Sequence, residues 1–174
     1  MTIVPVPCKV EIQNPDVQWD VVYSKLRISA LHNDTQSFSW KLIHKLLPCE
    51  SLVHHRLGNV TDMCRYSCNQ VADLEHCLLL CELVKEAGDW IMNLVLKSDP
   101  SVKPRDIVCL NFSGTDSLLW LVVNTLSFTW VKRSESKQAR SGDLIATLKQ
   151  TLEVMTYTEH KKLAEEALQI VSEN

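Results

Sequence analysis

Apolar residues recur at helical spacing along most of the chain, with polar residues between them. Residues 35–47 carry such a stripe and predict a helix that Pro48 ends. Residues 50–57 predict a second, shorter helix, which Gly58 would close. Residues 59–73 are polar and contain two cysteines, so we expect a loop there. The stripe of the first helix consists of Phe38, Leu42, Ile43, Leu46 and Leu47.

The same periodicity extends over longer segments further along the chain. Residues 73–95 are strongly helical in pattern, with Gly88 as the expected point of a break. Residues 98–114 contain two prolines and are expected to form a long connection. Residues 116–133 are apolar on nearly every side, which predicts a helix buried in the core.

The two ends of the chain differ in character. Residues 142–155 and 159–171 predict amphipathic helices that pack together as a hairpin. The first residues contain several prolines and read as irregular or extended, while the pattern over 17–31 fits either a short helix or a strand. The predicted organisation is an N-terminal arm over 1–23, a helical domain over 24–140, and a C-terminal helical hairpin over 141–174 that packs on the same domain.

Composition favours an all-α fold. The chain has 174 residues, enough for one domain, and contains only four glycines. A leucine-rich chain with so few turn-forming residues is typical of a helical protein rather than a barrel or a sandwich. Trp40, Trp120 and Trp130 are expected in its core.

Charge is distributed unevenly, although the formal net charge is only −3. Basic residues outnumber acidic ones over 25–65 and over 102–140. These two stretches could form one basic face, or they could be scattered charges in solvent. The most apolar stretch, 118–131, is too short to cross a bilayer, so no membrane contact is expected. Without the features of a signal peptide, the chain is expected to be intracellular, in the cytoplasm or the nucleus.

Four of the cysteines are clustered within 18 residues. In a chain without an export signal, this clustering favours a metal site over disulfides. Zinc in a structural role prefers four thiolate or imidazole ligands in a closed tetrahedron. Cys64 and Cys68 would supply two ligands from a tight loop, and Cys81 a third. The fourth stays open, because Cys77 lies four residues before Cys81, on the same face of an ideal helix, whereas His76 lies five residues before it.

No catalytic motif accompanies this cluster. The chain has no HExxH helix, no glycine-rich phosphate loop, no GxSxG elbow and no adjacent pair of aspartates. His54 and His55 are remote ligand candidates, which we interpret as solvent-facing side chains of a short helix. Four protein ligands leave no open position for a substrate. We therefore predict a small all-α domain with a zinc-stapled loop, one structural zinc ion and no enzymatic activity.

The residues around the cluster resemble a known family. Residues 38–48 and 118–133 are similar to the helices that precede and follow the zinc motif in the C-terminal region of non-LTR (LINE-type) retrotransposon reverse transcriptases. The likeness covers roughly residues 24–172. The family's CCHC zinc knuckle is matched by the spacing Cys64-x3-Cys68-x7-His76-x4-Cys81, in which the first gap is one residue longer than is common.

This resemblance implies that His76, rather than Cys77, completes the zinc site. It also implies an isolated or domesticated domain that binds RNA or single-stranded DNA through a basic face. Such phosphate contacts would be salt-dependent and weakly sequence-specific. Tyr66 could stack on a base or cover the zinc loop. The matching basic residues are Lys41, His44, Lys45, Arg56, Arg65, Lys132, Arg133, Lys137 and Arg140.

An alternative function is that of a protein–protein interaction or oligomerisation module with a purely structural zinc. The acidic C-terminal hairpin and the net charge of −3 favour this function. A protein partner or a second copy of the chain would then bind through residues 142–174.

Overall fold

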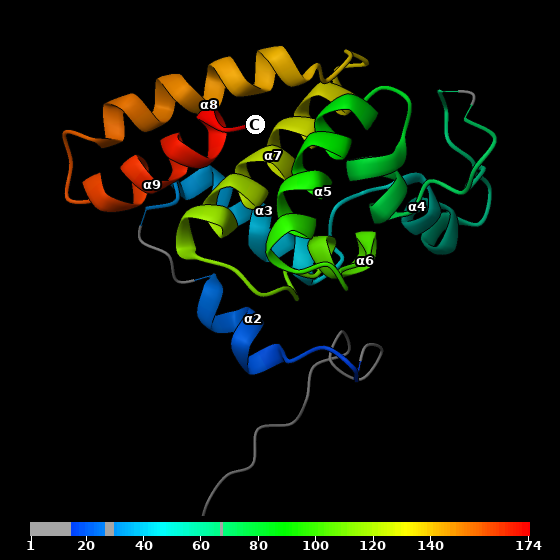
Figure 1. Ribbon diagram of the computed structural model, residues 1–174. Helices are drawn as coiled ribbons and strands as arrows, with labels where there is room; N and C mark the ends of the chain where they lie inside the picture. Colours follow the sequence, from blue (N-terminus) through cyan, green and yellow to red (C-terminus); the bar gives the residue numbers. More distant parts are fainter. Residues whose placement is uncertain (1–14, 27–29, 67) are drawn as a thin grey trace, which may run out of the picture.

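The computed structural model describes residues 15–26, 30–66 and 68–174 and folds them into helices (Figure 1). Within these ranges, extended pairing is limited to one antiparallel bridge between Met63 and Val71. The predicted all-α fold is therefore confirmed. The elements are α2 (Trp19–Lys25), α3 (Asn33–Ile43), α4 (Glu50–Leu57), η1 (His76–Leu80), α5 (Lys85–Ser98), α6 (Pro104–Val108), α7 (Asp116–Ser134), α8 (Ser141–Met155) and α9 (Lys161–Ser172).

Helix α7 forms the centre of the fold, with α3, α5 and α9 packed around it (Figure 1). Leu121, Val122 and Leu126 are fully buried on it. Removing apolar surface from water contributes about 25 cal/mol per Å², so a helix that is apolar on nearly every side stabilises the fold most when it is enclosed. The helix begins with a side-chain cap, in which Thr115 Oγ1 accepts a hydrogen bond from the Leu118 N–H at 3.2 Å.

Helices α8 and α9 pack against each other as an antiparallel pair and lie against α5 and α7 (Figure 1). The inward face of α8 presents three leucines, all buried: Leu144, Leu148 and Leu152. The Ser117 hydroxyl donates to Glu166 Oε2 at 2.9 Å and so ties the first turn of α7 to α9. The predicted C-terminal hairpin is confirmed.

Among the helices of the described residues, three end on a residue other than glycine in the left-handed conformation. At the end of α3, Lys45 has a φ of 51°. Its N–H donates to Leu42 O, and the next N–H donates to Lys41 O, which is the hydrogen-bond pattern of a Schellman cap. Leu110 and Ser136 end α6 and α7 with the same pattern. Glycine is preferred at such positions because it has no Cβ to clash.

The cap at Lys45 makes α3 shorter than the sequence pattern predicted. The helix ends at Ile43 and not just before Pro48. Leu46, which was assigned to the apolar stripe, is 48% exposed, so that assignment was wrong. Trp40 was also expected in the core and is 53% exposed, whereas Trp120 is 2% exposed, as predicted.

The helix predicted over 73–95 is interrupted earlier than expected. The break falls at residues 81–84, and Gly88 lies inside the first turn of α5. The backbone becomes extended at Cys81, with a ψ of 139°, which ends η1.

Two further segments differ from their predictions. The connection over 98–114 contains α6, which begins with Pro104, a residue suited to the first helical position. The last residues of the predicted arm belong to α2, so that part of the arm was wrong, and residues 1–14 lie outside the described residues.

Candidate metal centre

Residues 59–73, which we call the cysteine loop, fold back on themselves as a short hairpin. The Cys64 N–H donates to Gln70 O at 2.8 Å, next to the Met63–Val71 bridge. Asn69 has a φ of 52°, a conformation that asparagine tolerates better than most residues. The hairpin brings Cys64 and Cys68 together, with their sulfurs 3.6 Å apart.

A π-helical turn supplies the other two side chains. In η1, the Cys81 N–H donates to His76 O at 2.7 Å, a bond between residues five apart. This wider turn places His76 and Cys81 on one side, where a regular α-helix aligns residues four apart. Asp73 holds the start of the turn, since its Oδ1 accepts from the His76 N–H at 2.8 Å. The five-residue spacing of the motif therefore has a local structural cause.

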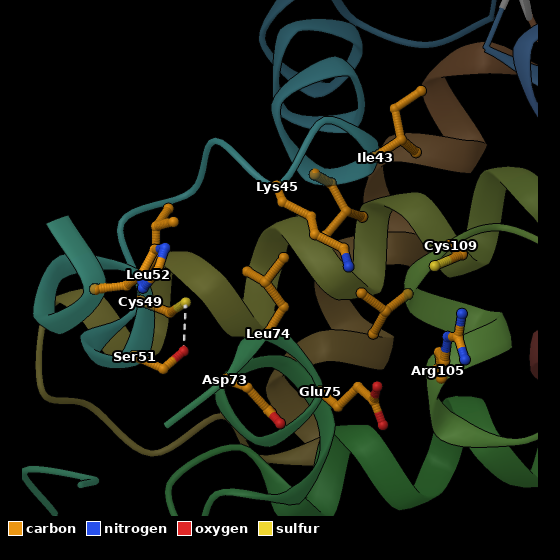
Figure 2. A pocket seen from close by; sticks show the side chains of 13 residues that line it. Ile43, Lys45, Cys49, Ser51, Leu52, Asp73, Leu74, Glu75, Arg105 and Cys109 are labelled. Atoms are coloured by element: carbon orange, nitrogen blue, oxygen red, sulfur yellow. Dashed lines mark hydrogen bonds between the residues drawn. The ribbon is translucent and has the colours of Figure 1, made fainter. Parts of the chain in front are cut away.

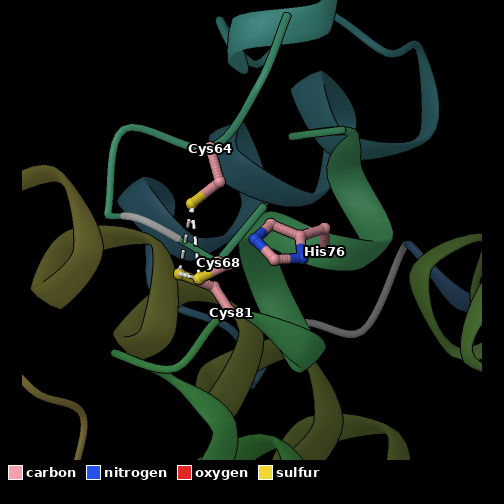
Figure 3. Close-up of side chains that lie close together, drawn as sticks. All are labelled: Cys64, Cys68, His76 and Cys81. Carbon is pink, nitrogen blue, oxygen red and sulfur yellow. Dashed lines mark hydrogen bonds between the residues drawn. The ribbon is translucent and has the colours of Figure 1, made fainter. Parts of the chain in front are cut away.

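The three sulfurs form a nearly equilateral triangle that the His76 ring faces (Figure 3). The Sγ–Sγ distances are 3.6 Å for Cys64–Cys68, 3.8 Å for Cys64–Cys81 and 3.7 Å for Cys68–Cys81. Two sulfurs bound tetrahedrally at about 2.3 Å from one zinc would lie about 3.8 Å apart. One ligand atom from each of the four residues lies within 4.8 Å of the others. Cys64, Cys68, His76 and Cys81 therefore form a group that could hold a metal ion.

The imidazole of His76 is placed so that it could bind a metal ion. The ring is 2% exposed, and its Nδ1 lies 3.2 Å from the side-chain oxygen of Gln70. Its Nε2 is buried without a hydrogen-bond partner among the described residues. A buried unpaired nitrogen is costly, and ligating histidines usually donate their other N–H to a nearby oxygen. A metal bound at Nε2 would satisfy both conditions.

Cys77 lies on the other side of the turn and outside the cluster. Its thiol is fully buried, with Sγ 3.7 Å from Oε2 of Glu50. Burial raises the pKa of Cys77, and its sulfur lies beside the Glu50 carboxylate and not among the three sulfurs of the group. The choice that helix geometry left open therefore falls on His76. His54 and His55 are exposed on α4 and do not join the group.

A buried ion pair lies directly behind the cluster. Arg133, near the end of α7, is 4% exposed, and its Nη2 lies 3.0 Å from each carboxylate oxygen of Glu50. The same nitrogen lies 3.7 Å from Cys64 Sγ. Arg65 reaches Glu50 from the cysteine loop, with Nε 2.5 Å from Oε1. Glu50 thus joins α4, α7 and the cysteine loop through charge-assisted hydrogen bonds.

This pair corrects the assignment of Arg133 to a basic surface. The guanidinium is enclosed by Glu50, by Cys64 and by the ring of Tyr66, whose centroid lies 5.1 Å away. The Tyr66 hydroxyl donates to Arg133 O at 2.6 Å. Both side chains hold the cysteine loop against α7, so for Tyr66 the structure favours the covering role over base stacking.

Hydrogen bonds around Cys64 favour its thiolate. Burial has the largest single effect and raises the pKa, but the neighbouring backbone of Tyr66 and the side chains of His76, Arg133 and Cys68 together lower it to about 6. Burial prevails at Cys81 and raises its pKa to about 11. A bound cation would supply the charge that lets both sulfurs bind as thiolates.

All but one of the other predicted basic residues fall into two groups. At the end of α3, the side chains of Lys41 and Lys45 are exposed and that of His44 is half-buried. The second group lies on the cysteine loop, at the end of α7 and in the turn that follows, and comprises Arg65, Lys132, Lys137 and Arg140. Arg56 is exposed near the end of α4.

Sequence reasoning missed two residues that shape the site and its surroundings. Glu50 gives no local signal, because its partner Arg133 is 83 residues away in the chain. Trp40 did give a signal. It follows Phe38 by two residues, about 200° around a helix of 3.6 residues per turn, so the periodicity itself places it opposite the apolar stripe.

Gly88 allows α5 to lie directly against η1. A Cβ at this position would lie 2.9 Å from Leu79 Cα and closer still to the Leu79 carbonyl oxygen, both of which are backbone atoms. We expect Gly88→Ala to lower the free energy of unfolding by about 1–3 kcal/mol through overpacking, measured by chemical denaturation. The control is Gly142→Ala in α8, where a Cβ meets nothing within 4 Å. That variant is expected to be unchanged or more stable by up to about 1 kcal/mol, and equal losses in both would contradict the close contact.

No family model, no curated protein and no solved structure matches the chain. The fold and the site alone therefore describe this protein: it is an all-α protein with three cysteines and one histidine that could hold a metal ion. Among the helices of the described ranges, none is long and apolar enough to cross a membrane.

Proposed function

We propose that this protein is a non-catalytic zinc-binding domain that binds RNA or single-stranded DNA at the exposed end of α3. The observation that carries the proposal is Trp40, a large aromatic side chain that is 53% exposed beside two exposed lysines, Lys41 and Lys45. Aromatic faces next to positive charge are the physical signature of single-strand binding, because every base can stack and every nucleotide carries a phosphate.

Zinc is the metal that suits the ligand set best. Three thiolates and one imidazole at tetrahedral spacing are typical of structural zinc, whereas magnesium and calcium prefer oxygen ligands. Cys64, His76 and Cys81 are buried, so protein side chains occupy the corners and leave no position for a substrate. In this role zinc fastens the cysteine loop to η1, and the ligand binds elsewhere on the surface.

The exposed end of α3 offers both kinds of contact. Trp40 and His44 are one turn apart, with ring centroids separated by 4.0 Å, and Tyr23 of α2 lies 6.0 Å from His44. Lys41 and Lys45 follow Trp40 and His44 directly in the sequence, and the side chains of both lysines are exposed. The resemblance to retrotransposon reverse transcriptases, which includes residues 38–48, supports the same location.

We expect Trp40→Ala to weaken binding to single-stranded RNA or DNA about five- to 150-fold, because stacking on an aromatic side chain contributes about 1–3 kcal/mol per base. The measurement is fluorescence anisotropy of a labelled oligonucleotide at low ionic strength. Wild-type affinity should also fall steeply as salt rises, since phosphate contacts release counterions.

The matched control is Tyr157→Ala, which removes an aromatic side chain that is 91% exposed at the turn between α8 and α9. It should leave the affinity unchanged. Equal losses in the two variants, or no binding by the wild type at low salt, would overturn the proposed function.

A protein-interaction or oligomerisation module is the second candidate. It is favoured by exposed apolar side chains near the turn of the C-terminal hairpin, where Val154 is 64% exposed and Tyr157 is 91% exposed. This candidate predicts a molar mass that rises with concentration in light scattering after gel filtration, and a return to the monomer mass in Tyr157→Ala. A single mass at every concentration would remove self-association through this turn.

A further inference from the structure

A cavity of about 360 Å³ opens between the end of α3, α4, α6 and residues 73–75 (Figure 2). This size falls within the range of small-molecule sites, about 300–1,000 Å³. Most of its wall is apolar, with contributions from Leu42, Ile43, Leu52, Leu74 and Val108. The cavity is separate from the metal-ligand group, whose residues do not line it.

Charged groups of both signs meet at one part of this cavity. Figure 2 shows the ends of Lys45, Arg105 and Glu75 around the same opening. The Glu75 side chain is half-buried, so its carboxylate can accept hydrogen bonds away from bulk water. Arg105 already pairs with Asp16 at 3.2 Å, whereas Lys45 has no ion-pair partner in the described part of the chain. Lys45 is therefore the cation available to a ligand.

The backbone at Lys45 directs this lysine to the cavity. Its left-handed conformation ends α3 and turns the chain, so that the side chain lines the opening. Leu110 and Ser136 end α6 and α7 in the same conformation without lining this cavity, so what distinguishes Lys45 is the position of its side chain at the opening.

We infer that the cavity binds one nucleotide. The base would lie between the apolar walls, with the N–H groups on one edge of the base donating to Glu75 and the phosphate on Lys45. Guanine suits the carboxylate best, because two neighbouring donors on one ring edge match two carboxylate oxygens. The apolar walls suit the faces of an unstacked base. The occupant is thus a guanine nucleotide, either free or as one residue of a single strand.

The single-strand form of this inference rests on the proposed function. Trp40 and Lys45 are five residues apart on α3 and its cap, roughly 7 Å along a helix axis. Each nucleotide of a stacked strand advances about 3.4 Å along the helix axis, so the two contacts would be about two nucleotides apart. A strand stacked on Trp40 could therefore place a nearby base in the cavity.

The test compares guanosine monophosphate with uridine monophosphate, and a uracil hexanucleotide with the same strand carrying one guanine. Isothermal titration calorimetry measures each affinity for the zinc-loaded protein. We expect the guanine ligand of each pair to bind at least tenfold more tightly. Glu75→Gln, which is nearly isosteric, should abolish that preference while the zinc content in native mass spectrometry stays the same. Lys45→Gly should weaken binding of the monophosphate but not of guanosine, and should fold at least as stably as the wild type.

The outcomes separate this inference from the proposed function. Hexanucleotide binding that depends on Trp40 but shows no guanine preference would overturn the cavity assignment alone. Binding of guanosine monophosphate that depends on Glu75, without binding of any strand, would support the cavity and overturn the single-strand function. A guanine preference that persists in Glu75→Gln would also overturn the assignment.

Discussion

Replacing Cys81 with serine is expected to reduce the zinc content from one ion per chain to none and to unfold the cysteine loop. Structural zinc contributes roughly 10–16 kcal/mol of binding free energy in zinc-finger peptides, as much as the total stability of an ordinary domain, about 5–15 kcal/mol. A metal ion held by this group would join the cysteine loop to η1, adding to the contacts that Arg65 and Tyr66 already make with Glu50 and Arg133. Native mass spectrometry gives the stoichiometry, and thermal unfolding gives the loss of stability.

The chain provides a matched control four residues earlier. Cys77 is as fully buried as Cys81 but faces Glu50 instead of the cluster. Cys77→Ser should therefore keep one zinc and lose only a modest amount of stability. A chelator should lower the thermal midpoint of the wild type and of Cys77→Ser, with little further effect on Cys81→Ser. Retention of zinc in Cys81→Ser together with its loss in Cys77→Ser would contradict the ligand set.

The second large effect is expected at Arg133, whose loss leaves a buried carboxylate without its main partner. Arg133→Met keeps most of the side-chain volume and should lower the free energy of unfolding by about 3–5 kcal/mol, the usual cost of breaking a buried ion pair from one side. Chemical denaturation in the presence of excess zinc measures this loss separately from metal release. The double variant with Glu50→Leu should recover much of the stability, because no buried charge then remains.

An exposed pair is the control for this measurement. Lys137 and Glu135 are 3.0 Å apart with both side chains largely in solvent, so Lys137→Met should change stability by less than about 1 kcal/mol. Comparable losses in Lys137→Met and Arg133→Met would show that burial does not set the strength of the Glu50 pair.

The Glu50 pair also has a pH dependence of definite sign. Burial raises the pKa of Glu50, but hydrogen bonds from Arg133 and Arg65 outweigh it and hold the pKa below its ordinary value. A depressed pKa contributes stability above the unfolded-state pKa and loses it as the pH falls through the folded-state value. The difference in free energy of unfolding between the wild type and Arg133→Met should therefore be largest near neutral pH and narrow as the pH falls through the folded-state pKa of Glu50, which chemical denaturation at a series of pH values measures.

Sequence periodicity was sufficient to predict where a helix ends when that end carries a residue with a known capping preference, such as glycine. Gly58 ends α4 at a φ of 73°, and the predicted bounds 50–57 agree with the structure. The apolar run of α7 likewise left no alternative to a core helix. The ends of α3 and α6 had no such marker, because Lys45 and Leu110 occupy positions where glycine is normally found. Their caps are visible only in the backbone.

The metal-ligand group could be predicted from residue types, but its geometry could not. The spacing indicated Cys64, Cys68 and Cys81. The position of His76 relative to these cysteines depends on the π-helical turn, which cannot be predicted from residue preferences. The Glu50–Arg133 pair joins residues far apart in the chain, so it cannot be predicted from local sequence patterns. Long-range contacts of this kind are decided by packing of the whole domain.

The π-helical turn of η1 aligns two candidate ligands that lie five residues apart. A relative with one residue fewer between His76 and Cys81 would present the two ligands four apart, which an ordinary α-helical turn aligns on one face. The same metal-ligand group could therefore survive a single-codon deletion at this point. A π-helical turn with four residues between the histidine and the cysteine, and an α-helical turn with three, would therefore place the two ligands in the same arrangement.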